Sequence, residues 1–161
     1  MKLGFIGTGK ITSAVVTGIC GSNISYKKII ISYRNKSIAQ SLKKRFKKIT
    51  ISKDNQEIVN TCDWIFLSVI PTVGEKIIKD LKFRSNQTII SFISTITLAQ
   101  LKKAIKVKAK IIRAIPLPPI SLKKGPVPIC PPNKSVKDFF NKIGTTVEIK
   151  NEKSSINFWT T

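Results

Sequence analysis

The stretch Lys2-Leu3-Gly4-Phe5-Ile6-Gly7-Thr8-Gly9-Lys10-Ile11-Thr12 decides the fold of this chain. Residues 2–6 are typical of a short buried strand, and the apolar residues from Ile11 to Ile19 recur at helical spacing. In that context a G-x-G motif indicates the phosphate-binding turn of a dinucleotide site. Gly7 permits the tight turn, and Gly9 lets the backbone approach a pyrophosphate at the helix N-terminus. The third position of the motif, usually Gly or Ala, is Thr12.

Length and composition limit the classes of protein to which this chain can belong. Its 161 residues can build one core, so we expect one full domain. No apolar run approaches the ~18–20 residues of a membrane span, and residues 2–6 read as a strand rather than a signal peptide. Cys20, Cys62 and Cys130 are isolated, which predicts no disulfide framework and a cytoplasmic setting. The sequence contains no histidine, which excludes imidazole catalysis and His-ligated zinc in this chain.

The formal net charge of +21 raises the question of a nucleic-acid partner. Nearly all of the excess is lysine, and it is spread along the chain, as a compositional bias would also produce. The basic run at residues 43–48 falls at the end of an expected helix, where cations suit the helix dipole. Because no aromatic interleaving and no zinc or RNA-binding motif accompanies the charge, we expect neither a nucleic-acid nor a membrane partner.

The rest of the chain alternates between strand-like and helix-like segments. Strands are expected near residues 2–7, 29–33, 49–52, 64–69, 88–92, 110–114, 127–130 and 146–149, and helices at 11–20, 36–46, 55–60, 73–81, 97–104 and 135–142. Repeated βα units of this kind predict an α/β fold of the Rossmann type, with a doubly wound, mostly parallel sheet in three layers. The proline-rich residues 116–119 are expected to form a rigid, extended loop.

The expected end of the second strand, Ser32-Tyr33-Arg34-Asn35, bears on the choice between NAD and NADP. NAD-binding domains place a carboxylate on the ribose 2′-hydroxyl about twenty residues beyond the glycine turn. Here no Asp or Glu occurs before Asp54, whereas twelve Lys or Arg residues lie among residues 1–53. Arg34 and its polar neighbours supply donors suited to a 2′-phosphate, and Arg34 could also stack on the adenine. We therefore expect NADP as the cofactor, although Arg34 alone would also fit a solvated loop.

Six blocks of sequence, in order, resemble pyrroline-5-carboxylate reductases. They are residues 4–11, 32–35, 54–59, 62–71, 89–94 and 113–116, so the resemblance covers about residues 1–130. It implies an enzyme of proline biosynthesis that reduces the C=N bond of a cyclic imine with NADPH. It also implies a Rossmann domain, here residues 1–150, followed by a helical dimerisation domain that would start within residues 151–161. A homo-oligomer is expected only if that helical domain exists.

The resemblance implies roles for particular residues. Gly7, Thr8, Gly9, Lys10 and Ile11 would hold the pyrophosphate, Ser32, Arg34 and Asn35 the 2′-phosphate end, Asn55 the adenosine side, and Ser68, Val69 and Pro71 the nicotinamide ribose and ring. Local structure gives some of them a second interpretation, since Asn55 follows Asp54 as part of a helix cap and Pro71 is typical of a helix start. No catalytic residue and no metal ligand is predicted in this chain.

Three positions at the expected substrate end differ from the family pattern. They are Ser94-Thr95 after the fifth strand, Leu117-Pro118-Pro119 after the sixth, and Ile70 where lysine is frequent. These differences predict a divergent subgroup with an imine or related substrate. Two hypotheses follow: an NADPH-dependent imine reductase that needs a further C-terminal part, or a non-catalytic NADP-binding module.

Overall fold

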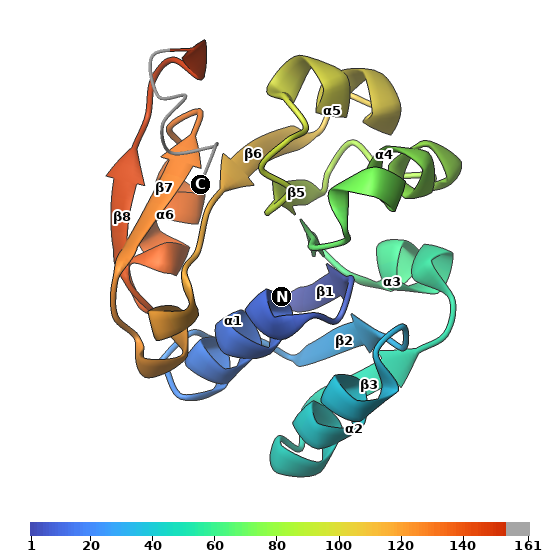
Figure 1. Ribbon diagram of the computed structural model, residues 1–161, viewed down its shortest axis with the longest axis vertical. Helices are drawn as coiled ribbons and strands as arrows, with labels where there is room; N and C mark the ends of the chain where they lie inside the picture. The colour runs from blue at the N-terminus through green and yellow to red at the C-terminus, as the bar shows by residue number, and fades with distance from the viewer. Residues whose placement is uncertain (154–161) are drawn as a thin grey trace.

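The computed structural model describes residues 1–153, which form a three-layer α/β fold around one eight-stranded sheet (Figure 1). The strands are β1 (Lys2–Ile6), β2 (Lys28–Ser32), β3 (Ile49–Ser52), β4 (Trp64–Leu67), β5 (Thr88–Ser91), β6 (Lys110–Ala114), β7 (Pro126–Cys130) and β8 (Thr145–Glu148). Their order is β3-β2-β1-β4-β5-β6-β7-β8, and every neighbouring pair is parallel except β6 with β7. The predicted doubly wound, mostly parallel sheet is therefore confirmed.

Two apolar cores, one on each face of the sheet, hold the helices in place. The helices are α1 (Lys10–Cys20), α2 (Lys36–Arg45), α3 (Asn55–Thr61), α4 (Pro71–Asp80), α5 (Leu98–Ile105) and α6 (Lys134–Phe140). Buried side chains of α1, α2 and α6 share one core with the sheet, and those of α3, α4 and α5 share the other. The strands are apolar on both faces because both faces are covered.

The strand order creates the crevice in which ligands of such folds usually bind. The chain moves outward from β1 to β2 and β3, then returns to place β4 on the other side of β1. The carboxyl ends of β1, β2 and β4 consequently meet at one edge of the sheet, where α1, α2 and α4 begin. This reversal of strand order is the topological switch point of an open α/β sheet.

One expectation about the secondary structure is wrong in part. Residues 116–119 were expected as an extended loop, but Pro118–Leu122 forms a 3-10 helix, η1. Proline is tolerated there because Pro118 occupies the first helical position, where its missing N–H would have had no partner. The buried Ile120 of η1 packs against α1 so closely that a Cβ on Gly18 would lie 2.5 Å from the Ile120 carbonyl oxygen.

The described residues end just after β8. The helical domain expected to start within residues 151–161 lies, from residue 154 onward, outside the described residues. Within residues 1–153, no helix combines the length and the apolar character that a membrane crossing needs.

Candidate functional site

The turn between β1 and α1 is built around Gly7. Its φ of 102° lies in the region that favours glycine, and a Cβ there would lie 2.3 Å from the backbone oxygen of Ser68. Thr12, fully buried at the third motif position, donates a hydrogen bond of 2.7 Å from its hydroxyl to the Gly7 carbonyl. Thr12 therefore stabilises the turn from within the helix.

The N-terminus of α1 faces open space. Gly9 is its N-cap residue and has an ordinary φ of −98°, and a Cβ on it would meet no atom within 4 Å. No side chain of the described residues caps this helix, and its first turn holds no acidic residue. Free N–H groups and the positive end of the helix dipole thus point at a place where a phosphate group fits.

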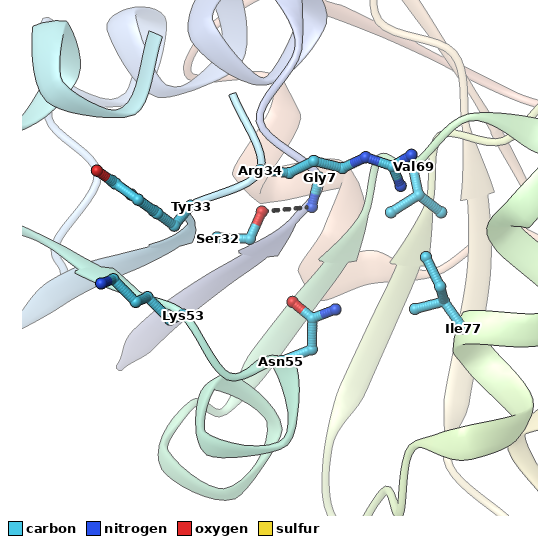
Figure 2. Close-up of a pocket in the computed structure, with 8 residues that line it drawn as sticks. All are labelled: Gly7, Ser32, Tyr33, Arg34, Lys53, Asn55, Val69 and Ile77. Atoms are coloured by element: carbon cyan, nitrogen blue, oxygen red, sulfur yellow. Dashed lines mark hydrogen bonds between the residues drawn. The ribbon is translucent and has the colours of Figure 1, made fainter. Parts of the chain in front are cut away.

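Two adjoining hollows lie along the carboxyl ends of β1, β2 and β4. The first has a volume of about 310 Å³ and is lined by Gly7, Ser32, Tyr33, Arg34, Lys53, Asn55, Val69 and Ile77 (Figure 2). The second has a volume of about 440 Å³ and is lined by Gly7, Thr8, Gly9, Arg34, Asn35, Lys36, Ser68, Val69 and Ile70. Nine of the twelve residues predicted for the cofactor are thereby brought together, while Lys10, Ile11 and Pro71 line neither hollow.

The hydroxyl of Ser32 is engaged in the glycine turn. It accepts a hydrogen bond of 2.9 Å from the Gly7 N–H and lies 2.8 Å from the Thr8 hydroxyl, which itself donates to the Ser32 carbonyl oxygen. Ser32 is only 5% exposed. Its predicted contact with a 2′-phosphate stays a prediction, and the structure gives its side chain a second task, which is to join the end of β2 to the turn after β1.

Cationic side chains surround the end of β2. Among residues 1–153, Arg34, Lys36 and Lys53 are the charged residues that line the two hollows, and no carboxylate of this part of the chain lines either of them. Asn35 caps α2 through its side-chain oxygen, which accepts from the Ile38 N–H at 3.1 Å. Lys36 and Lys53 are not predictable from the motif that follows β2, because neither residue belongs to it.

The end of β3 contributes Asn55, the first residue of α3. Asp54 is the N-cap of this helix and accepts from the Gln56 N–H at 2.9 Å, as the local pattern predicted. Because Asp54 makes the cap, the side chain of Asn55 is available to a ligand. Figure 2 shows it directed from α3 into the first hollow, below Gly7 and Arg34.

The end of β4 supplies the remaining wall. The Ser68 hydroxyl is buried and has no hydrogen-bond partner among the described residues, which is costly unless a bound molecule provides one. Val69 is nearly buried, and Ile70 is 56% exposed beside it. Pro71 starts α4 at its first position, as its second interpretation predicted. This end of the crevice is therefore apolar, except for the Ser68 hydroxyl, which lacks a hydrogen-bond partner among the described residues.

The described residues offer no obvious nucleophile or metal centre. Cys20, Cys62 and Cys130 are absent from both hollows, and burial raises the pKa of all three thiols, that of Cys62 to about 11. The raised pKa favours the protonated thiol, the less nucleophilic form, at all three positions. Within residues 1–153, no three Cys, Asp or Glu side chains gather in a way that could hold a metal ion.

Comparisons with known proteins agree with this geometry. Residues 2–95 match a family model described as "NADP oxidoreductase coenzyme F420-dependent". Pyrroline-5-carboxylate reductase 3 of Danio rerio is 29% identical over 128 residues, which are 78% of this chain and 44% of the relative. Pyrroline-5-carboxylate reductase of Synechocystis sp. is 28% identical over 159 residues, 92% of this chain and 58% of the relative.

Solved structures lead to the same group of proteins. The crystal structure of Plasmodium falciparum pyrroline carboxylate reductase with NADP bound superposes with a TM-score of 0.82 at 26% identity. That alignment covers 96% of this chain and 59% of the other. The chain thus spans about half the length of the relatives that it matches. The matches confirm the resemblance seen in the sequence, and the family model confirms the prediction of an NADP-binding domain.

Proposed function

The chain belongs to the family of NADP oxidoreductases described as coenzyme F420-dependent, and from this premise we propose that it is an NADPH-dependent reductase of a cyclic imine. The reaction would resemble that of pyrroline-5-carboxylate reductase, an enzyme of proline biosynthesis. NADPH, when bound, would supply the hydride for the C=N carbon of the substrate, and the imine nitrogen would take up a proton from solvent. The chain's own residues bind the cofactor, orient it and exclude water.

The pair of hollows at the carboxyl ends of β1, β2 and β4 is the observation that best supports NADPH as the cofactor. The uncapped N-terminus of α1 and the open space above Gly9 suit a pyrophosphate. The cations around β2 suit a 2′-phosphate, and the unpartnered Ser68 hydroxyl suits a ribose hydroxyl. Along the carboxyl edge of the sheet, the cations at β2 come first, the N-terminus of α1 after β1 comes second, and Ser68 after β4 comes third. An extended NADP presents its 2′-phosphate, its pyrophosphate and its nicotinamide ribose in the same order.

Each part of the cofactor would be bordered by a different group of the predicted residues. The pyrophosphate would lie beside Gly7, Thr8 and Gly9 and beside the first N–H groups of α1, which belong to Lys10 and Ile11. The adenosine end would lie beside Arg34, Asn35 and Asn55, and the nicotinamide end beside Ser68, Val69 and Pro71. Ser32 acts from beneath by holding the glycine turn.

The substrate part of the proposal rests on the family resemblance and on the apolar end of the second hollow. The ring carbons of a cyclic imine would lie beside the exposed Ile70, at the end of β4. We further propose that residues 1–150 are the NADP-binding unit, and that the remaining contacts to the substrate come from a helical part that starts within residues 151–161. The observation that favours the second hypothesis, a non-catalytic NADP-binding module, is that no Asp, Glu, Tyr or Cys among residues 1–153 lines the second hollow.

The experiment measures cofactor binding and turnover separately. The full chain is titrated with NADPH and with NADH by calorimetry, and NADPH oxidation is then followed with pyrroline-5-carboxylate as substrate. We expect a dissociation constant for NADPH at least about tenfold below that for NADH, and substrate-dependent oxidation. No affinity for NADPH would refute both hypotheses, whereas tight binding without turnover would favour the non-catalytic module.

A further inference from the structure

We infer that Lys53, together with Lys36, is the specificity-determining contact for the 2′-phosphate, and that Arg34 instead covers the adenine. This inference rests on the proposed NADPH binding and identifies which side chains choose between NADP and NAD. Both lysines lie outside the motif at the end of β2 in which such contacts are usually sought.

The register of the sheet places Lys53 next to Tyr33. Ser32 and Ser52 are paired across the parallel strands β2 and β3, so the residues that follow them leave the sheet side by side. The Lys53 ammonium lies 5.4 Å from the centre of the Tyr33 ring. Figure 2 shows both side chains on the same side of the first hollow. Lys53 is therefore part of the wall around the β2 end although it is twenty residues beyond Tyr33 in the chain.

Lys36 approaches the same ring from another element. It is the first residue of α2, and its ammonium lies 5.7 Å from the Tyr33 ring centre. Contacts of this kind hold a flexible lysine near one position, which lowers the entropy that is lost when the ammonium binds an anion. Tyr33 thus lies within 6 Å of two ammonium groups, that of Lys53 at the first hollow and that of Lys36 at the adjoining second hollow.

Lys53 is followed in the chain by Asp54, but among residues 1–153 neither Lys36 nor Lys53 forms an ion pair. The acidic residues closest in sequence are engaged at the start of α3, where Asp54 caps the helix and Glu57 accepts a hydrogen bond of 2.6 Å from the Ser52 hydroxyl. A phosphomonoester carries nearly two negative charges and three acceptor oxygens, so it can accept from both ammonium groups.

Arg34 is directed to a different part of the hollow. Figure 2 shows its side chain crossing the hollow toward Val69, away from Tyr33 and Lys53. Val69 and Ile77 form the apolar wall on that side. Arg34 and this apolar wall both line the first hollow, and Arg stacks readily on aromatic faces. Adenine, which NADP and NAD share, would lie between them.

The experiment compares dissociation constants of NADPH and NADH, measured by calorimetry on the full chain, for single variants. We expect K53Q to weaken NADPH about tenfold and to leave NADH within about twofold, with K36Q acting in the same direction. R34Q is expected to weaken both cofactors by similar factors. The matched control is K48Q, because Lys48 also lies over a tyrosine ring, 5.0 Å from the centre of Tyr26, but lines neither hollow.

Several results would overturn the inference. Equal weakening of both cofactors by K53Q, or no weakening, would remove Lys53 from the phosphate site, and a loss confined to NADPH in R34Q would assign the phosphate to Arg34. Wild-type protein that fails to bind NADPH would instead refute the proposed function. Since the substituted lysines and Arg34 are exposed, unchanged thermal unfolding in each variant would show that the differences arise at the site.

Discussion

Two glycines of one turn, Gly7 and Gly9, are required for different physical reasons. Gly7 has a positive φ, and a Cβ on it would collide with backbone atoms of Ser68, so a side chain there strains the fold itself. Gly9 has an ordinary φ and faces open space, so a side chain there would disturb only a bound molecule. The same residue type thus serves folding at one position and binding at the other.

Substitution by alanine should separate these two roles. We expect Gly7→Ala to lower the free energy of unfolding by at least about 2 kcal/mol. Gly9→Ala should change it by less than about 1 kcal/mol and should still raise the dissociation constant of NADPH at least about tenfold. Urea unfolding and calorimetric titration of both variants measure these effects. A destabilised Gly9→Ala, or one with full affinity, would contradict the interpretation.

Residue patterns predicted part of this site, and geometry that they do not encode supplied the rest. The phosphate-binding turn was predictable from Gly7 and Gly9, because such a turn demands particular residue types at fixed spacing. The preference for NADP was predicted from the absence of Asp or Glu before Asp54. The contribution of Thr12 was not predictable, because its hydrogen bond depends on the turn's final shape. Lys53 was missed because its place depends on the register between β2 and β3.

At the scale of elements, alternating apolar segments predicted the strands and α-helices of residues 1–153 to within two residues at each end. Propensity could not predict η1, because that short helix is stabilised mainly by packing against α1. Nor could local patterns predict the link made by Glu152. This carboxylate lies beyond β8, yet it binds Arg113 of β6 at 2.5 Å and accepts from the Leu98 N–H of α5 at 3.0 Å.

Glu152 should therefore contribute to stability although it lies close to the end of the described residues. The Arg113 side chain is 3% exposed, so Glu152→Gln would take away an opposite charge that lies 2.5 Å from a buried guanidinium. We expect a loss of about 2 kcal/mol in the free energy of unfolding, measured in urea. The control is Asp138→Asn, which removes the exposed pair with Lys134 and should cost less than about 0.5 kcal/mol. Equal losses in both variants would argue against a special role for the Arg113 pair.

At the scale of the whole molecule, the fold class was predictable because βα alternation leaves few arrangements other than a mostly parallel, three-layer sheet. The role of the net positive charge was harder to predict, because composition does not show which Lys or Arg side chains bind an anion. With 29 Lys or Arg and 8 Asp or Glu, most cations lack an acidic partner. In the structure, Arg34, Lys36 and Lys53 surround the hollows, and many other lysines are exposed.

Salt should consequently act in opposite directions on folding and on cofactor binding. Repulsion among excess cations is stronger in the compact state than in the unfolded chain, and salt screens it over a Debye length of about 10 Å at 0.1 M. We therefore expect the free energy of unfolding, measured with the uncharged denaturant urea, to rise with sodium chloride. The affinity for NADPH should fall over the same range, because its phosphates meet the same screened cations. NADH is the control: it lacks the 2′-phosphate, so its affinity should fall less steeply. If the affinities for NADPH and NADH fell equally with salt, the cations around β2 would not bind the 2′-phosphate, whatever their effect on stability.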